Sequence, residues 1–393
     1  MLNVLVITTS FPLNSASRSG IFVKKLICNF PPTIQVTVIT PDSSKPSAND
    51  EKHEYTLIRF RYAPKKLQQL AHGPGGIVVA LTEKKWTFLL LPFFLSAAFI
   101  VSFRQALKAD VIYANWSVNG VIGGIVGTMT RTPVVTTLRG TDVNKMNDSF
   151  SFRSLIRICV KLSSRIVTVS HSLRKELLSL FPGFENKMQV IHNGIDDVFF
   201  NTGEKHSLSS IRLISISNLI PGKGVNLILE ALEQLANYSW TLDIVGDGTE
   251  QPALQKICVE KGLQDRIFFQ GAVPPDDIPE ILHRADILVF ASLKEGRSNV
   301  VLEAMASGLA IVASNIPSVS ELIRDGREGL LFDAGQSEDL CQKLKHLLQH
   351  PDERLKMGYE ARQSILQEGF TWQAAGQRYA EVFSQTIQNC LQK

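Results

Sequence analysis

Short segments of almost continuous apolar residues alternate with helical patterns along this chain, in two successive runs. Strands of this kind are buried on both faces, which is typical of parallel sheets covered by helices on either side. A length of 393 residues also suits two domains better than one. The pattern therefore predicts an α/β protein with two doubly wound, Rossmann-like domains. The expected strands are residues 2–8, 35–40, 111–114, 133–138 and 165–170, followed by 211–217, 241–246, 266–271, 287–291 and 310–313.

The boundary between the domains is expected near residues 199–210, where the stretch 201–207 is polar and rich in turn formers. We assign residues 1–198 to a first domain and 199–370 to a second, and expect the last helix, within 371–393, to return to the first.

The net charge of +4 divides unevenly between the two halves. Residues 1–200 hold 23 lysines and arginines against 12 aspartates and glutamates, a net charge of +11. Residues 201–393 hold 18 against 25, a net charge of −7. This division indicates different partners for the two domains, and phosphates or an anionic membrane surface would suit the basic half.

Residues 86–103 form an uncharged, strongly apolar run, with Lys84 and Lys85 before it and Arg104 and Lys108 after it. As a helix kinked at Pro92, it is slightly short of a bilayer core. Three interpretations stay open. The run is a buried core helix, a helix lying in the headgroup plane of an anionic membrane, or a membrane span, and the span is the least favoured.

Several motifs of other enzyme classes are absent from the sequence. It has no G-x-G-x-x-G, no G-x-x-x-x-G-K-[ST] phosphate loop and no G-x-S-x-G nucleophile elbow, which argues against dehydrogenases, P-loop ATPases and hydrolases. There is no Asp-x-Asp pair and no histidine spacing for a metal, so we expect no metal site. The five cysteines are far apart, which favours a reducing, cytoplasmic location over a disulfide framework.

Two loops could bind an anion at the start of a helix. The small-residue loop at 15–20, which ends at Gly20, leads into a helix, and Lys223 lies between an expected strand and the next helix. A lysine at a helix N-terminus is unfavourable unless an anion is bound there, so Lys223 is a candidate phosphate ligand. An ordinary turn and a solvated lysine are the structural alternatives.

The sharpest feature is a pair of glutamates, Glu295 and Glu303, separated by seven residues. Glu295 is expected in the loop at the carboxyl end of a strand, and Glu303 in the next helix, among apolar residues. A carboxylate in such surroundings is costly unless donors satisfy it, and the hydroxyls of a sugar or a ribose are such donors.

With these residues identified, the chain resembles the retaining glycosyltransferases of family 4, in which two Rossmann-like domains face each other across a cleft in the GT-B fold. The resemblance covers essentially the whole chain, and E-x7-E is its most specific motif. The matching segments are residues 10–12, 20–23, 109–116, 133–142, 190–196, 218–224, 245–248, 269–271 and 295–308.

The resemblance implies transfer of a sugar from a UDP- or GDP-linked nucleotide diphosphate sugar to an acceptor hydroxyl, with retained configuration and no cofactor or metal. By this resemblance Lys223 stabilises the departing diphosphate, Glu303 holds the ribose hydroxyls and Glu295 contacts the transferred sugar. The backbone near Gly271 would face the base, and the loop around Gly20 would close on the phosphates. The substrate-binding set that it implies is Gly20, Asn218, Gly271, Val273, Glu295, Asn299 and Glu303.

The sequence departs from the family pattern at three positions. Many members have an arginine where this chain has Asn218, which cannot neutralise phosphate. Many have a histidine where this chain has Arg139, which could supply positive charge at the diphosphate or at an anionic acceptor, and we count it as a catalytic candidate. Arg297 replaces a residue that is often aromatic or small, so the sugar stays open.

We therefore expect a hexosyltransferase on the cytoplasmic face of a membrane that extends a lipid-linked or cell-surface saccharide. It would be peripheral, docked through residues 86–103 and their basic flanks, with no nucleic-acid partner. The alternatives are a non-catalytic homologue that binds nucleotide sugars or glycolipids, and another GT-B enzyme such as a sugar-nucleotide epimerase. Binding without turnover would identify the first, and an epimerised nucleotide sugar the second.

Overall fold

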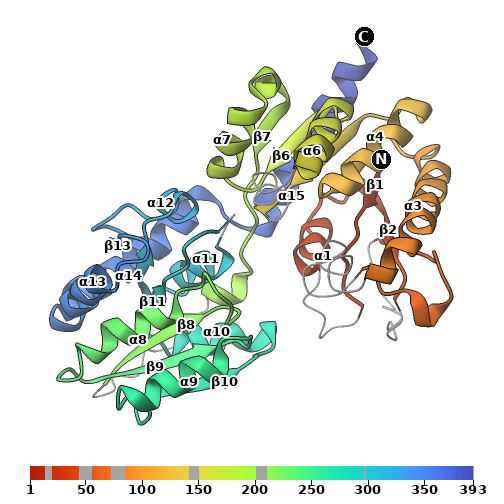
Figure 1. The fold of residues 1–393 in the computed structure, drawn as a ribbon. Coiled ribbons are helices and arrows are strands. Elements are labelled where there is room, and N and C mark those ends of the chain that lie inside the picture. The colour runs from red at the N-terminus through yellow and green to blue at the C-terminus, as the bar shows by residue number, and fades with distance from the viewer. Residues whose placement is uncertain are drawn as a thin grey trace. The chain divides into compact units, whose positions relative to one another are not determined.

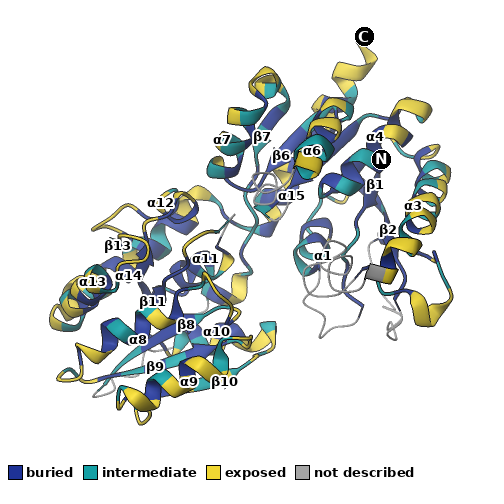
Figure 2. Ribbon diagram, viewed as in Figure 1, coloured by how far each residue is buried: buried dark blue, intermediate teal, exposed yellow. Residues whose placement is uncertain are grey.

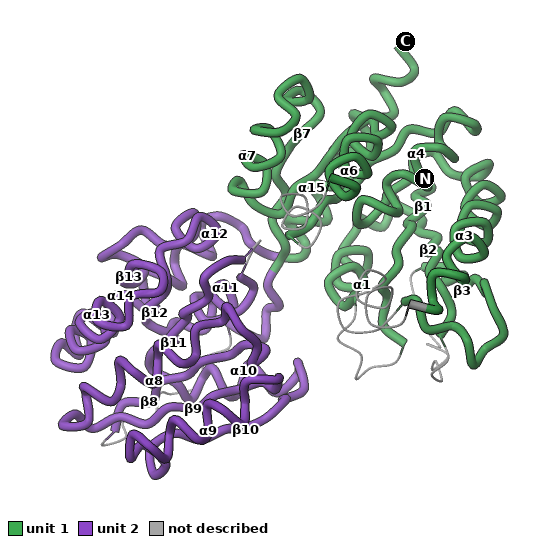
Figure 3. Tube along the Cα trace, viewed as in Figure 1, with its two compact units in different colours: residues 1–194, 372–393 green, residues 195–371 purple. Residues whose placement is uncertain are grey.

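The computed structural model describes residues 1–13, 20–43, 55–71, 85–140, 150–200, 210–295 and 298–392. The chain forms two compact units (Figure 3). Unit 1 comprises Met1–Gly194 with Trp372–Lys393, and unit 2 comprises Ile195–Thr371.

Unit 1 is built on a parallel sheet that has seven strands in the described residues, in the order β3-β2-β1-β4-β5-β6-β7 (Figure 1). The strands are β1 (Leu2–Ile7), β2 (Ile34–Pro41), β3 (Tyr55–Phe60), β4 (Val111–Asn115), β5 (Val134–Leu138), β6 (Arg165–Thr168) and β7 (Met188–Val190). Its main helices are α1 (Ile21–Ile27), α3 (Leu91–Ala106), α4 (Ser117–Thr130), α6 (Phe150–Leu162), α7 (His171–Leu180) and α15 (Trp372–Leu391). Helices α1 and α15 pack on one face of this sheet, and α3 and α4 pack on the other.

Unit 2 repeats the architecture with a sheet whose described strands run in the order β10-β9-β8-β11-β12-β13. The strands are β8 (Ile211–Ile216), β9 (Trp240–Val245), β10 (Ile267–Gly271), β11 (Ile287–Phe290), β12 (Ala310–Ser314) and β13 (Gly329–Phe332). The helices are α8 (Val225–Glu233), α9 (Gln251–Glu260), α10 (Ile278–His283), α11 (Asn299–Ala306), α12 (Pro317–Ser320), α13 (Ser337–Gln349) and α14 (Pro351–Glu368). Helices α8, α9 and α13 cover one face, and α10, α11, α12 and α14 cover the other.

The α/β class and the two doubly wound domains are confirmed. Central strands such as β11 and β12 are buried along their whole length, which is the reason for their continuous apolar sequence. The sequence analysis did not identify three strands: β3, β7 and β13. All three lie at the ends of their sheets, where a strand has only one neighbour.

Residues 195–198 belong to unit 2, although the sequence analysis placed them at the end of the first domain. The backbone N–H of Ile195 donates to the carbonyl of Phe370 at 2.9 Å, and Ile195 and Phe199 are buried in the core of unit 2. The expected linker, 201–207, lies outside the described residues.

Helix α15 packs in unit 1, far along the chain from the sheet that it covers. Its Tyr379 and Phe383 are buried against Tyr113 of β4, with ring centroids 5.1 and 5.6 Å from it. Gly376 lets α15 approach the backbone just after α1, because a Cβ at that position would lie 2.0 Å from the carbonyl oxygen of Asn29.

The apolar run does not form one kinked helix. A 3-10 helix, η2 (Lys85–Leu90), passes into α3, and Pro92 lies in the first turn of α3, where a missing N–H costs nothing. Phe94, Ala98 and Ser102 form a buried stripe. Other apolar residues along η2 and α3 are either exposed, such as Phe93, or half-buried against the core, such as Phe99 (Figure 2). Within the described residues, Trp86–Ala106 is long and apolar enough to cross a membrane, and 22% of its most apolar stretch is buried.

Candidate active site

The candidate site in unit 2 lies where the strand order reverses. Strand β8 pairs with β9 on one side and with β11 on the other, so the helices that follow β8 and β11 leave the sheet in different directions. In doubly wound sheets the crevice at this point, outside the carboxyl ends of the strands, is where ligands bind. The loop after β8 carries Lys223, and the loop after β11 carries Glu295.

Lys223 and Glu295 form an ion pair between these two loops. Nζ of Lys223 donates to Oε1 of Glu295, and each side chain is 21% exposed. The hydroxyl of Ser292 donates to the same oxygen at 3.3 Å. The backbone N–H of Leu293 donates to the carbonyl of Gly222 at 2.9 Å, which ties the loops together independently of the ion pair.

Two glycines let the loops around Lys223 approach their neighbours. Gly224 has φ of 68°, and a Cβ there would lie 2.2 Å from the carbonyl oxygen of Ala291. Gly246, after β9, has φ of 132°, and a Cβ there would lie 1.8 Å from the carbonyl oxygen of Ser217. Any larger residue would displace the backbone that carries Lys223.

Helix α11 carries Glu303, as the sequence predicts. Ser298 caps the helix, since its hydroxyl accepts from the N–H of Val301 at 3.3 Å. Asn299, the first helical residue, is exposed, and Glu303 is half-buried between the buried Leu302 and Ala304. Arg297 lies outside the described residues.

The other expected donor-side residues lie in unit 2 without contacting the ion pair. Asn218 is exposed, just beyond β8. Gly271 ends β10 with φ of 67°, and its carbonyl accepts from the N–H of Gly246 at 2.8 Å. Val273 is half-buried and packs against the core under α10. Within the described residues, no hydrogen bond joins Asn218 or Val273 to Lys223 or Glu295.

Arg139 lies in unit 1, directly after β5, and is 8% exposed. Its Nη1 donates to Oδ1 of Asn193 at 3.2 Å and its Nη2 to Oδ1 of Asn115 at 3.4 Å. The guanidinium carbon lies 3.9 Å from the ring centroid of Phe22 and 6.0 Å from that of Trp116. Two amides and two rings therefore fix the plane of the guanidinium.

A buried chain of polar groups leads from Asn115 to helix α15. The hydroxyl of Tyr113 donates to Asn115 at 3.3 Å and accepts from Thr137 at 3.2 Å. The Thr137 and Tyr379 hydroxyls lie 2.8 Å apart. Burial, reinforced by Tyr113, raises the pKa of Tyr379 well above the ordinary value, so its hydroxyl stays protonated.

Gly20 has a structural reason to be glycine. It precedes α1 with φ of 72°, and a Cβ there would lie 2.2 Å from the carbonyl oxygen of Ser10. The remainder of the expected phosphate loop, 15–19, lies outside the described residues.

Several residues that surround the candidates were not predicted from the sequence. Ser292 directly follows the strand before Glu295, and this position was a signal that could have identified it. Asn115 and Asn193 lay only within the matching segments 109–116 and 190–196, and neither was given a role. The link through Tyr379 could not be anticipated, because it joins residues 242 positions apart. Within the described residues, no group of three His, Cys, Asp or Glu side chains could hold a metal ion.

Two family models match successive parts of the chain. The model described as Glycosyltransferase Family 4 matches residues 33–199, and the model described as Glycosyl transferases group 1 matches residues 202–364. The chain belongs to the family 4 glycosyltransferases.

Among curated relatives, this glycosyltransferase is similar to N-acetyl-alpha-D-glucosaminyl L-malate synthase of Bacillus anthracis. The two are 27% identical over 276 residues, which are 67% of this chain and 72% of the relative. Among solved structures it resembles HepE of Anabaena in complex with UDP, with a TM-score of 0.74, 22% identity and coverage of 98% and 100% of the two chains. The sucrose-phosphate synthase of Thermosynechococcus elongatus gives a TM-score of 0.78 at 17% identity, with coverage of 99% and 100%. These two structures support the fold.

Proposed function

We propose that this glycosyltransferase moves a hexose from a nucleotide diphosphate sugar to an acceptor hydroxyl, with retention of configuration and without a metal ion. The observation that carries the proposal is the Lys223–Glu295 pair at the reversal point of the unit 2 sheet. It lies beside the N-terminus of α8, which has no side-chain cap and no acidic residue in its first turn. A lysine and free backbone N–H groups together favour a diphosphate.

In this proposal each residue has a separate task. Lys223 stabilises the negative charge that develops on the leaving diphosphate, the largest catalytic contribution in such a reaction. Glu295 contacts the transferred sugar, and Glu303 accepts hydrogen bonds from the ribose hydroxyls. Because Lys223 and Glu295 are paired, donor binding exchanges the carboxylate partner of Lys223 for phosphate and frees Glu295 for the sugar hydroxyls.

The named relatives support a nucleotide-sugar donor. HepE has been solved in complex with UDP-glucose. The Bacillus anthracis relative is by name a synthase of N-acetyl-alpha-D-glucosaminyl L-malate. A screen of nucleotide sugars identifies which sugar and which nucleotide base the donor carries.

The test is a screen of UDP- and GDP-linked hexoses for thermal stabilisation, followed by turnover with the sugar that binds. Lys223→Ala is expected to lower kcat by about 10²–10³-fold, because it removes a charge needed in the transition state. Glu303→Gln is expected mainly to raise the donor KM. The control is Lys345→Ala, an exposed lysine on α13. Unchanged turnover in Lys223→Ala, or an inverted anomer in the product, contradicts the proposal.

We further propose that the acceptor is a lipid-linked or cell-surface saccharide and that the enzyme acts as a peripheral protein on the cytoplasmic face of the membrane. The exposed apolar side chains of η2 and α3 support this, since a water-soluble surface seldom carries so many in one segment. They are Trp86, Phe88, Leu89, Phe93, Leu95 and Ile100. The exposed Arg104 and Lys108, at and just beyond the end of α3, would meet anionic headgroups.

A further inference from the structure

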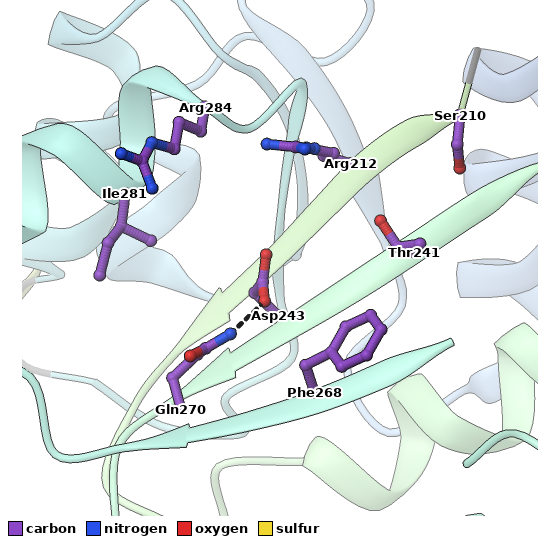
Figure 4. A pocket seen from close by; sticks show the side chains of 8 residues that line it. All are labelled: Ser210, Arg212, Thr241, Asp243, Phe268, Gln270, Ile281 and Arg284. Atoms are coloured by element: carbon purple, nitrogen blue, oxygen red, sulfur yellow. Dashed lines mark hydrogen bonds between the residues drawn. The ribbon is translucent and has the colours of Figure 1, made fainter. Parts of the chain in front are cut away.

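Unit 2 contains a pocket of about 510 Å³ that none of the proposed roles uses (Figure 4). Strands β8, β9 and β10 form its floor, and α10 with the residue after it forms one side. The side chains that line it are Ser210, Arg212, Thr241, Asp243, Phe268, Gln270, Ile281 and Arg284.

The pocket is separate from the Lys223–Glu295 pair. Ser210 and Arg212 lie at the amino end of β8, and Arg284 lies before β11, whereas Lys223 and Glu295 follow the carboxyl ends of these strands. Six residues of β8 lie between the two ends. At about 3.3 Å per residue, the two ends of β8 lie roughly 20 Å apart.

Within the described residues, this part of the sheet is bare on one face. On the covered face, Leu242 and Ile244 of β9 are completely buried under α8 and α9. On the pocket face, Thr241 and Asp243 of the same strand are only half-buried, and the ring of Phe268 on β10 is 45% exposed. Doubly wound sheets normally bury both faces, so an exposed aromatic ring among polar side chains on such a sheet favours a ligand at this position.

The polar groups leave hydrogen-bonding capacity open toward the pocket. Gln270 Nε2 donates to Asp243 Oδ1 at 2.6 Å, and Figure 4 shows this pair beside Phe268. The guanidinium of Arg212 makes no hydrogen bond or ion pair within the described part of the chain, and Figure 4 shows it directed toward α10. Its donors, the Thr241 hydroxyl and the second Asp243 oxygen are thus available to a ligand.

The charges favour a neutral ligand over an anion. Arg284 is paired with Glu280, and the charge of Arg212 is offset by that of Asp243 on the same floor. A phosphate would meet the Asp243 carboxylate, whereas the hydroxyls of a sugar can donate to it and accept from Arg212. The apolar face of a sugar ring fits against an exposed aromatic ring.

We propose that this pocket is a second saccharide-binding site. It holds one or two neutral sugar residues, with a ring against Phe268 and with Arg212 and Asp243 binding the hydroxyls. The sugar belongs to an oligosaccharide, because the donor sugar is assigned to Glu295 at the opposite end of the strands. Saccharide binding here does not require the transfer reaction, because the residues that bind the sugar all belong to this pocket.

The experiment is calorimetric titration of the full chain, without donor, with neutral gluco-, galacto- and manno-trisaccharides, and separately with the nucleotide sugar that stabilises the protein. Phe268→Ala and Arg212→Ala are expected to weaken saccharide binding about tenfold, which is the loss of roughly one ring or hydrogen-bond contact. The control is Tyr359→Ala, an exposed aromatic residue on α14 of the same unit. Circular dichroism confirms that each variant is folded.

The two titrations distinguish the possible outcomes. Loss of trisaccharide binding with unchanged nucleotide-sugar binding supports the proposal. Parallel loss of nucleotide-sugar binding overturns it, because the pocket would then belong to the donor site. The proposal is overturned if no trisaccharide binds, or if Phe268→Ala binds trisaccharides as the wild type does. It is also overturned if Phe268→Ala changes the oligomeric state in light scattering, since the bare face would then be a protein interface. Turnover lost in Lys223→Ala but kept in Phe268→Ala distinguishes this site from the transfer site.

Discussion

Two cationic side chains of the proposed reaction are held in different ways. Lys223 is held by a carboxylate, and that contact can be exchanged when a phosphate arrives. Arg139 is held by two amide oxygens and two aromatic rings, and these contacts need not break when an anion binds. We therefore expect Lys223 to move on donor binding and Arg139 to keep its position.

The placement of Arg139 depends on the planar guanidinium, and this can be tested by substitution. Arg139→Lys keeps the charge but loses the stack on Phe22 and the paired contacts to Asn193 and Asn115. We expect kcat/KM to fall at least about tenfold, nearly as far as in Arg139→Ala. Steady-state kinetics check this, with Arg131→Lys, an exposed arginine after α4, as the control. Wild-type rates in Arg139→Lys would show that charge alone matters.

Individual elements of unit 2 are also stabilised by charge. The turn before β13 holds Glu328, which is completely buried, between Arg324 and Arg327. The backbone N–H of Arg324 donates to Glu328 Oε2 at 2.9 Å, and Nε of Arg324 donates to Oε1 at 2.9 Å. Burial alone would raise the pKa of Glu328, but the hydrogen bonds and charge of Arg324 hold it below the ordinary value.

This lowered pKa makes the stability of the turn depend on pH. The stabilisation is fully present above about pH 4.3, the pKa of an unfolded glutamate, and is lost as the pH falls through the lower folded pKa. We expect Glu328→Gln to reduce the free energy of unfolding by about 2 kcal/mol at pH 7 and to flatten its acid dependence. Denaturant unfolding between pH 7 and pH 3 measures both, with the exposed Glu338→Gln as control. An equal acid slope in Glu328→Gln contradicts the assignment.

At the scale of the whole molecule, the central strands could be predicted because helices bury both of their faces, which leaves a continuous apolar sequence, as for β11 and β12. The end strand β3 could not, because its exposed and half-buried residues interrupt the apolar signal. Lys223 and Glu295 were identified one at a time from their loops. Their contact depends on β8 lying beside β11, and that order arises from the packing of the complete sheet.

The proposed membrane docking would use unit 1, and the exposure of its side chains decides which substitutions test it. Phe94 is fully buried, so charge there would damage the core, whereas Leu89 and Phe93 are 74% and 63% exposed. We expect Leu89→Glu with Phe93→Glu to abolish co-sedimentation with anionic liposomes at low salt. Val259→Glu, at an exposed apolar position on α9, is expected to leave binding intact. Equal sedimentation of both variants would show that α3 does not dock.

The position of α15 in the sequence delays the completion of unit 1 during synthesis. The sheet of unit 1 is complete at β7, but Tyr379 and Phe383 cover one of its faces only after all of unit 2 has been synthesised. A nascent chain that has finished unit 2 therefore still exposes apolar strand surface in unit 1. Synthesis of the roughly 200 residues from the end of β7 to the end of α15 takes roughly 10–40 s at about 5–20 residues per second. Until α15 packs on this sheet, the exposed strand surface is of the kind that chaperones bind.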